Sequence, residues 1–498
     1  MRDGQSGELT IVSNRLPVVL KQRDDGWIAD SGCGGLVQAM EPLLEMRGGR
    51  WVGWPGVVEG DDEGWKAALA SARRGKGYEL VPVVFSEEEY EGYYEGYANS
   101  VIWPLFHGLA SRCDFDRHFS ECYEGVNQRF GQALKEEVSS KGLVWVHDYH
   151  LMALGRVMRN QGHRGRLAFF LHIPFPSPEV FSRLPGGEAL LADLLAYDQI
   201  GFQTARDRDH FRACVEQAGL ARGVEEASGL WFEVGQRQVF CGAFPIGIDA
   251  AEFEARARSK KVAARARTLD ERMGGRPVLL GVDRLDYTKG LVQRLEAWER
   301  ALEREPELVE SATFFQLLVP SRENVEEYRR LKERLDELVG RINGRFGTSV
   351  WQPIHYRYSG VDPEELAALY RLARAAVVTP LCDGMNLVAK EYCVSQVDEP
   401  GVLILSEFAG AADQLGEAAL MVNPHDMEEL SSAMVEALAM ERPERRRRMA
   451  IAQKEVHASD VYRWAESFLE ALGNPRPRGA ETTSPEVAMD LGSMTSPT

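Results

Sequence analysis

The feature of this sequence that most limits its fold is a series of short apolar segments, each followed by polar or glycine residues and then by a helix-forming stretch. The segments are LTIVSNR, LVWVHDYH, LAFFLHIPF, VLLGVDRLDYTKG, TFFQLLVPSRE, AAVVTPLCDGMN and GVLILSEFAGA. Short apolar runs that alternate with helices are typical of parallel strands buried on both faces. The sequence therefore predicts an α/β fold. Ligands of such sheets bind beyond the carboxyl ends of the strands, where these polar residues fall.

The chain is long enough for two domains. One hydrophobic core stops growing well below 498 residues. A boundary is predicted near FPIGIDAAEF, because the charged, helix-forming segment 250–275 follows it and the next strand begins at Pro277. We expect domains at 1–249 and 250–455 that face each other across a cleft. The tail 474–498 is rich in Pro, Thr, Ser and Gly and is expected to be disordered.

Charge and composition exclude several classes of protein. A net charge of −18 argues against a nucleic-acid partner, whereas a small anion needs only a few basic side chains gathered locally. No apolar run approaches the roughly 20 residues of a membrane span, and the polar start lacks the layout of a secretory signal. We therefore expect a cytoplasmic protein without a membrane partner. The seven scattered cysteines lack a CxxC pair, which favours reduced thiols.

Two glycine and arginine motifs near the start have alternative interpretations. Arg15 ends the first apolar segment, and Gly34 and Gly35 open a helical pattern. These glycines could let the backbone approach a phosphate at a helix N-terminus, or they could form only a tight turn. The spacing does not complete GxGxxG, which disfavours a dinucleotide-dependent oxidoreductase.

Aromatic residues gather in WVGWPG and YYEGYANSVIWPLFH, with Trp54, Tyr94 and Trp103. In a loop-rich region, aromatic rings with polar tips suit sugar binding. The alternative is that they belong to a half-buried core.

Histidines and an aspartate follow two neighbouring strand-like segments. His147, Asp148 and His150 lie in WVHDYHL, and His172 lies in FFLHIPFP. The pair of histidines follows a strand rather than lying on a helix, and no HExxH motif accompanies it, so no metal is expected. We expect Asp148 and His172 to bond sugar hydroxyls or to act on charge near a reacting carbon.

The second half of the chain carries the basic residues. Arg284 and Lys289 follow a strand in GVDRLDYTKG, where two cations could neutralise a diphosphate leaving group, and Arg322 has a similar place. A solvated loop is the alternative. Asp383 begins DGMN, a turn into a helix whose free N–H groups could hold phosphate or sugar. Glu391, two turns later, could accept bonds from ribose hydroxyls.

These motifs together resemble the trehalose-6-phosphate synthase family from about Leu9 to Leu472. The shared blocks occur in family order: SNR, GWPG, YYEGYANSVIWP, VHDYHL, LHIPFPSPE, GFQT, PIGID, RLDYTKG, GRINGRFG, DGMNLVAKEY and LSEFAGAA. The resemblance implies two Rossmann-like domains in the GT-B arrangement, with a last helix, 456–473, that crosses back onto the first domain. It also implies transfer of glucose from a nucleotide-glucose, UDP-glucose above all, to glucose 6-phosphate with retention of configuration and without a cofactor. The expected products are α,α-trehalose 6-phosphate and a nucleoside diphosphate.

Carried over residue by residue, the resemblance implies three sets of site residues. The donor would be bound by Gly34, Gly35, His172, Arg284, Lys289, Asp383, Gly384, Met385, Asn386, Leu387, Val388 and Glu391. The acceptor would be bound by Arg15, Trp54, Tyr94, Trp103, Asp148 and Arg322. The residues expected to act in catalysis are Asp148, His172, Arg284 and Lys289. No side chain is expected to be a nucleophile; the leaving diphosphate would depart from the face where the acceptor attacks and would take its proton.

Cys382 departs from the family pattern, which usually has arginine before DGMN, and this puts the identity or affinity of the donor in doubt. Two further alternatives are a related transferase that uses glycerol 3-phosphate and a non-catalytic regulatory member of the family. The first differs at HDYH and HIPFP, and the second would have lost its donor ligands. The nucleotide of the donor, UDP, ADP or GDP, stays open, as does a homo-oligomeric state. A separate phosphatase is expected to act on the product.

Overall fold

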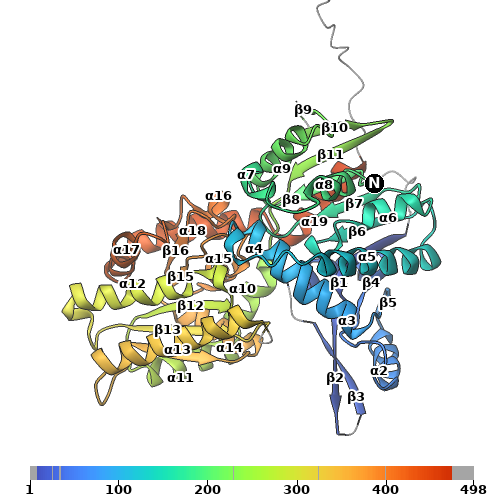
Figure 1. The fold of residues 1–498 in the computed structure, drawn as a ribbon. Coiled ribbons are helices and arrows are strands. Elements are labelled where there is room, and N and C mark those ends of the chain that lie inside the picture. The colour runs from blue at the N-terminus through green and yellow to red at the C-terminus, as the bar shows by residue number, and fades with distance from the viewer. Residues whose placement is uncertain are drawn as a thin grey trace, which may run out of the picture.

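Two large, mostly parallel β-sheets flanked by helices lie side by side in the described part of the computed structural model (Figure 1). The structure describes residues 8–24, 26–32, 35–227, 229–322, 325–398 and 400–473. Gly34 and the tail 474–498, about which the sequence made predictions, lie outside the described residues. Each strand-like segment named above forms a strand, which confirms the α/β prediction.

The first sheet has nine strands in the order β5-β4-β1-β6-β7-β8-β11-β10-β9. In this spatial order the first seven strands, β5 through β11, are parallel to one another. Strand β10 pairs antiparallel with both of its neighbours, β11 and β9. Their bounds are β1 Leu9–Arg15, β4 Arg50–Trp54, β5 Glu79–Pro82, β6 Leu143–His147, β7 Leu167–Phe170, β8 Gln199–Phe202, β9 Gly223–Glu226, β10 Gly229–Val234 and β11 Arg237–Ala243. A separate antiparallel hairpin, β2 Val18–Arg23 and β3 Gly26–Ser31, projects from this half (Figure 1).

The second sheet has six parallel strands in the order β14-β13-β12-β15-β16-β17. Their bounds are β12 Val278–Arg284, β13 Thr313–Val319, β14 Ile354–Tyr358, β15 Ala375–Val378, β16 Val402–Ser406 and β17 Leu420–Val422. Strand order reverses direction between β12 and β15, and such a point in a parallel sheet is a usual ligand position.

In the described ranges, helices separate most of the strands, except within β1 to β3 and within β9 to β11. Those of the first half are α1 Gly35–Arg47, α2 Gly64–Arg73, α3 Glu87–Tyr90, the π-helix η1 Glu91–Ile102, α4 Trp103–Phe106, η2 Ala110–Arg112, α5 Arg117–Glu137, η3 Tyr149–Leu151, α6 Leu154–Asn160, α7 Pro178–Phe181, α8 Gly187–Leu194 and α9 Ala205–Gln217. Those of the second half are α10 Ala250–Arg258, α11 Lys260–Arg272, η4 Tyr287–Lys289, α12 Leu291–Arg304, η5 Pro306–Leu308, α13 Glu326–Phe346, α14 Pro363–Leu372, α15 Leu387–Ser395, α16 Ala412–Leu415, α17 Met427–Ala439, α18 Arg442–Ala458 and α19 Val461–Gly473.

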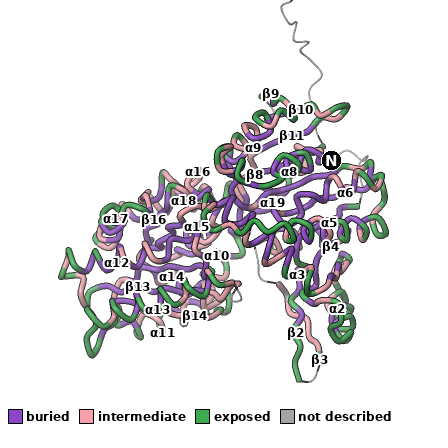
Figure 2. Tube along the Cα trace, viewed as in Figure 1, coloured by how far each residue is buried: buried purple, intermediate pink, exposed green. Residues whose placement is uncertain are grey.

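The central strands are buried on both faces, as Figure 2 shows. In β6, Trp145 packs with the core of α1 and α19, whereas Val144 and Val146 pack with the core of α5 and α6. Successive side chains of a strand point to opposite faces, so a strand covered on both sides must be apolar throughout. This is why the continuous apolar runs predicted these strands.

The aromatic segment around Tyr94 is helical, so the expectation of a loop-rich region is wrong. The helices α3, η1 and α4 follow one another without a break, starting from a capping box at Ser86. In η1 the side chains of Asn99 and Ser100 bond the carbonyls of Tyr94 and Glu95, five residues back. π-Helical turns are rare and often lie at functional sites.

Within the residues that the structure describes, the chain passes twice between the two sheets. It leaves β11 and reaches α10 through residues 244–249, and it returns from α18 to α19 at residues 459–460. The two passages touch: the N–H of Val461 bonds the carbonyl of Ile248 at 3.1 Å, and a Cβ on Gly247 would lie 2.2 Å from the carbonyl oxygen of Ser459. The exact domain bounds stay predictions.

None of the helices in the described part of the chain is long and apolar enough to cross a membrane.

Candidate functional site between the two sheets

The predicted site residues lie where strands of both sheets end. Arg15 ends β1, Trp54 ends β4, and Asp148 follows β6, while Arg284 ends β12 and Arg322 follows β13. Arg284 and Arg322 both lie over the ring of Trp103 in the first half, 5.8 and 4.2 Å from its centre, so the carboxyl ends of the two sheets meet here.

An aromatic cluster holds Arg15. Its guanidinium carbon lies 4.6 Å from the centre of the Trp54 ring. Trp54 packs against Tyr90 at 4.8 Å between centroids, Tyr90 stacks on Tyr94 at 5.3 Å, and Tyr94 stacks on His150 at 5.8 Å. Apart from this cluster, Arg15 is exposed. A cation over the face of tryptophan is attracted by the ring but keeps its N–H donors free.

Arg322 joins the two halves. One guanidinium nitrogen donates to the Tyr149 hydroxyl at 3.2 Å, and the guanidinium carbon lies 4.2 Å from the centre of the Trp103 ring. Within its own half, Arg322 bonds Tyr328 and lies 3.6 Å from Asp286. Its backbone φ of 50° is left-handed, which is uncommon for arginine and costs energy.

Arg15 and Arg322 both lower the pKa of the same imidazole, although they come from opposite halves of the chain. The pKa of His150 is well below its ordinary value, first because of burial and then because of Arg322 and Arg15. His150 is therefore neutral, and the two guanidinium groups share one electropositive region.

Asp148 faces cations from the second sheet. Its backbone φ of 75° is left-handed, and one carboxylate oxygen accepts the N–H of His172 at 3.2 Å. Burial raises the pKa of Asp148 to about 6, although the N–H groups of Tyr149 and His172 and the guanidinium groups of Arg284 and Arg322 favour the charged form. A carboxylate near neutrality can exchange protons under ordinary conditions.

His172 is fixed by two side chains that the sequence did not single out for it. Its Nε2 lies 3.2 Å from Nδ1 of His147, and its Nδ1 lies 3.5 Å from Nε2 of Gln203. The amide nitrogen of Gln203 can only donate, so Nδ1 of His172 accepts and Nε2 carries the proton. Burial lowers the pKa of His172 to about 3, so the ring is neutral. Contact of His172 with a donor sugar stays a prediction.

Lys289 and Asp383 form an ion pair, with Nζ 2.5 Å from the carboxylate. The side-chain amide of Asn386 donates to the same oxygen at 3.1 Å. Burial raises the pKa of Asp383, but the Lys289 ammonium, together with His107 and the Asn386 amide, holds the pKa below its ordinary value. The Oδ1 of Asn386 is buried and has no partner in the described part of the chain.

Glycines allow the two halves to touch at this point. A Cβ on Gly384 would lie 2.3 Å from the carbonyl oxygen of His172, and a Cβ on Gly35 would lie 2.5 Å from a methyl carbon of Leu387. Gly35 begins α1 and Leu387 begins α15, so two helix N-termini face each other. Met385 is buried and Val388 half-buried. Helix N-termini attract anions.

Glu391 lies further along α15, where its carboxylate accepts the hydroxyl of Tyr370 at 2.8 Å. Burial raises the pKa of Glu391, which Tyr370 partly offsets. Tyr370 lies in a plain helical pattern, so no sequence signal could have identified it.

Cys382 precedes this turn and is half-buried. Burial, followed by Asp383 and Asp207, raises the pKa of its thiol to about 12, so it is neutral and supplies no charge. Arg206 at the start of α9 is among the cations near enough to oppose that shift.

Sequence reasoning missed the buried residues that hold the predicted ones. Besides Gln203 and Tyr370, these are Asp286 and Tyr149, whereas His147 was named from its motif without a role as a support for His172. Asp286 lies inside RLDYTKG and Tyr149 inside HDYHL, so their motifs were the available signal. Asp286 stays charged because Arg322, Lys289 and Arg284 outweigh the effect of burial and lower its pKa.

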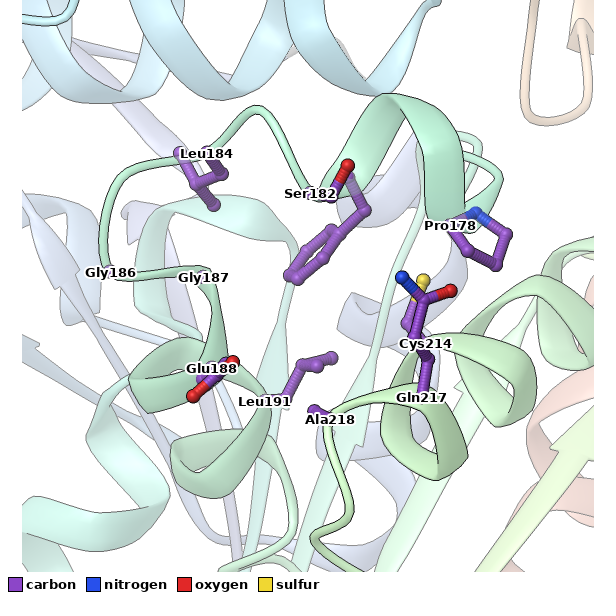
Figure 3. A pocket seen from close by; sticks show the side chains of 11 residues that line it. Pro178, Ser182, Leu184, Gly186, Gly187, Glu188, Leu191, Cys214, Gln217 and Ala218 are labelled. Carbon is purple, nitrogen blue, oxygen red and sulfur yellow. The ribbon is translucent and has the colours of Figure 1, made fainter.

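No group of three His, Cys, Asp or Glu side chains in the described ranges could hold a metal ion. A hollow of about 340 Å³ between α7, α8 and α9 includes Leu191, Cys214 and Gln217 and none of the predicted site residues (Figure 3).

The sequence pattern of glycosyltransferase family 20 matches residues 7–474. The chain belongs to glycosyltransferase family 20. An alpha,alpha-trehalose-phosphate synthase (UDP-forming) A of Dictyostelium discoideum is 41% identical over 94% of this chain, which spans 63% of that relative's length. An alpha,alpha-trehalose-phosphate synthase (UDP-forming) 1 of Aspergillus niger is 40% identical over 95% of this chain and 91% of its own.

Solved structures agree with this family assignment. The synthase of Burkholderia xenovorans in complex with glucose-6-phosphate has a TM-score of 0.84 and 35% identity, and covers 94% of this chain and 100% of its own. An E. coli structure bound with UDP-2-fluoro glucose has a TM-score of 0.85 and 33% identity, and covers 95% of this chain and 100% of its own. The family 20 chain described here is thus a glycosyltransferase with two Rossmann-like domains in the GT-B arrangement.

Proposed function

We propose that this chain transfers glucose from UDP-glucose to glucose 6-phosphate with retention, releasing UDP and α,α-trehalose 6-phosphate. The observation that carries the acceptor assignment is the convergence of Arg15 and Arg322 on His150 from opposite halves of the chain. Two guanidinium groups suit a phosphate dianion, because each can donate charge-assisted hydrogen bonds. The names of the relatives support UDP as the nucleotide.

The sugar of the acceptor would lie among Trp54, Tyr94, Trp103 and Asp148. The indole N–H of Trp103 is buried without a partner in the described part of the chain. A buried donor without a partner costs about 1–3 kcal/mol, and a sugar hydroxyl would satisfy it. The Asp148 carboxylate would accept bonds from other hydroxyls of the acceptor.

The donor would lie between Gly35 and the turn at Gly384, with Glu391 on its ribose. Arg284 and Lys289 would neutralise the diphosphate. Lys289 is paired with Asp383, so diphosphate binding would share the ammonium between a carboxylate and a phosphate oxygen. The unpartnered Oδ1 of Asn386 would accept a hydroxyl of the transferred glucose, and neutral Cys382 would leave Arg206 as a further cation nearby.

Bond making and breaking would occur on one face of the glucose. An acceptor hydroxyl oxygen forms the new bond to the anomeric carbon, the bond from that carbon to the diphosphate breaks, and the hydroxyl proton passes to the departing oxygen. Arg284 and Lys289 would stabilise the charge that grows on that oxygen; losing one such donor typically costs about 10²-fold or more in rate.

Purified protein assayed with UDP-, ADP- and GDP-glucose tests the proposal, with glucose 6-phosphate, glycerol 3-phosphate or glucose as acceptor. We expect much faster UDP release with glucose 6-phosphate than with glycerol 3-phosphate or glucose, and an α,α linkage in the product by NMR. Faster turnover with glycerol 3-phosphate would make the chain a glucosylglycerol-phosphate synthase. No turnover with any pair would favour a regulatory member. A separate phosphatase for the product, a homo-oligomeric state and a cytoplasmic location stay predictions.

A further inference from the structure

Basic side chains line a second hollow, of about 710 Å³, in the first half of the molecule. Five cations and one carboxylate face it, together with His163: Lys141, Arg159, Arg164, Arg166, Arg237 and Asp198. We name these residues the basic hollow. Such a concentration is unexpected in a chain with a net charge of −18, because like charges repel unless something neutralises them.

The basic hollow lies at the edge of the sheet opposite the candidate active site. Lys141 comes just before β6, Arg166 just before β7 and Asp198 just before β8, while Arg237 begins β11. The candidate active-site residues follow or end their strands instead. Because these strands are parallel, the two groups lie at opposite strand ends, and no residue belongs to both.

Two of the cations have a structural explanation. Arg159 pairs with Asp198 at 2.7 Å and donates to the carbonyls of His163 and Gly165. Arg237 donates to the carbonyls of Leu195 and Ala196, just past the end of α8. Cations at a helix C-terminus are stabilised by the exposed carbonyls. Asp198 therefore balances only one of these two charges.

The other three cations have no such role. Lys141, Arg164 and Arg166 are exposed and make no ion pair with any described residue. The loop that carries Arg164 is held against the preceding loop, because the N–H groups of Arg164 and Gly165 both donate to the carbonyl of Ser140. The three side chains are thus kept on one rim around Arg159 and Arg237.

Inside the hollow, Arg159 acts on two neighbouring groups, the half-buried Arg237 and the buried His163. The pKa of Arg237 is lowered by burial and then by Arg159, and Asp198 only partly opposes this. The pKa of His163 is lowered by burial and then by Arg159. A bound anion would raise the pKa of Arg237 and of His163, since an opposite charge nearby stabilises a cation.

We propose that the basic hollow binds a small phosphorylated anion, at a site separate from the catalytic cleft. Guanidinium groups match phosphate oxygens in geometry and charge, and the hollow is concave. A duplex nucleic acid would need a wide basic surface, whereas these cations are confined to one hollow formed by the end of α6 and the starts of β6, β7, β8 and β11.

Calorimetric titration with inorganic pyrophosphate tests the proposal. The variant Lys141→Ser/Arg164→Ser/Arg166→Ser removes the three exposed cations, and Arg74→Ser/Lys135→Ser/Arg183→Ser removes three exposed cations elsewhere on the same half. Pyrophosphate can also enter the catalytic cleft, so the parent should show two binding events. We expect the first variant to lose one of them, with at least a 10-fold weaker Kd, and the second variant to keep both. Both variants should retain the parent's circular dichroism and turnover without pyrophosphate.

Orthophosphate and a sugar phosphate in place of pyrophosphate would define which phosphate compounds the hollow accepts. Identical isotherms for the parent and both variants would overturn the proposal. Equal weakening in both variants would also overturn it, because only the overall charge would then matter. Tighter binding of a DNA duplex than of pyrophosphate, lost in the first variant, would show a nucleic-acid surface instead.

Discussion

At the scale of single residues, the two arginines of the acceptor region are held in different ways. Arg15 is exposed and is held by the Trp54 ring and by Tyr90, whereas Arg322 is bonded to Tyr149 and Tyr328 and pairs with Asp286. Removing Arg322 would leave Asp286 buried without its partner, which is strongly destabilising. Arg15 is therefore the cleaner test of the phosphate clamp.

We expect Arg15→Ala to lower kcat/KM for glucose 6-phosphate by about 10- to 100-fold, because a charge-assisted hydrogen bond to phosphate contributes about 1.5–3 kcal/mol. Turnover with free glucose should change little. Lys66→Ala is the control, since Lys66 also lies over a tryptophan ring, 5.7 Å from the centre of Trp65, but outside the site. An unchanged ratio of the two acceptors in Arg15→Ala would contradict the clamp.

Asp148 gives the site a pH dependence. With its pKa raised to about 6 by burial, the carboxyl group is protonated below that pH and loses acceptor capacity. We expect kcat/KM for the acceptor to fall as pH drops through about 6. The substrate phosphate titrates near the same pH, with a second pKa of about 6. The fall in kcat/KM that the phosphate causes should persist in Asp148→Asn. The fall that Asp148 causes should disappear in this variant.

The same shift has a consequence for stability. Because the pKa of Asp148 is higher in the folded than in the unfolded chain, the folded chain holds the proton more tightly. Protonation of Asp148 therefore adds to the free energy of unfolding. The contribution is full below about pH 4 and is lost as pH rises through about 6. Urea unfolding of the parent and of Asp148→Asn across this range measures it. Parallel pH profiles for the two proteins would show that Asp148 is not shifted.

The sequence predicted the motif residues of the site but not their supports. Lys289 and Asp383 stand beside glycines after strands and Arg284 ends a strand, which is a readable pattern. The partners that fix the predicted residues, such as Gln203 for His172 and Tyr370 for Glu391, come from distant elements. Nothing in local composition identifies a pairing that only the tertiary fold creates.

At the scale of elements, prediction succeeded where burial on both faces made a strand continuously apolar, as in β6 and β12. It missed the hairpin of β2 and β3, because β2 alternates between buried and exposed side chains. It also took the aromatic segment 91–102 for a loop. Its glycines allow tight packing on α5: a Cβ on Gly92 would lie 2.4 Å from the sulfur of Cys122.

In the turn before α15, an added methyl group should lower activity more than it lowers stability. In Gly384→Ala the new Cβ would meet the carbonyl oxygen of His172, so the two halves must shift apart at the donor position. We expect kcat to fall by about 10²-fold, since small misplacements at a reacting centre cost that much. Thermal unfolding should change less.

Gly344→Ala is the matched control for that substitution. Gly344 lies inside α13, and a Cβ there would meet nothing within 4 Å. Alanine should stabilise the helix by about 0.5–1 kcal/mol and leave turnover intact. Normal turnover in Gly384→Ala would show that the reaction tolerates a larger separation between the turn at Gly384 and the backbone of His172.

At the scale of the whole molecule, the last helix ties the two halves together. Helix α18 packs on α15 and α10 beside the second sheet, and two residues later α19 packs beneath the first sheet. Phe468 of α19 is fully buried and stacks on Trp145 of β6 at 4.3 Å, and its carbonyl accepts the side chain of Gln199 at 2.8 Å. The first sheet therefore completes its core with helix α19.

Phe468→Ala should expose this dependence. The cavity left by the ring would cost about 3–5 kcal/mol, and the loss would fall on the first sheet alone, because Phe468 contacts Trp145, Phe170 and Phe244. Urea unfolding followed by tryptophan fluorescence should then show a transition at lower urea than in the parent, with the second sheet unfolding later. Glu466→Ala, an exposed position on the same helix, should leave the curve unchanged. A Phe468→Ala curve within about 1 kcal/mol of the parent would show that the first sheet is stable without α19.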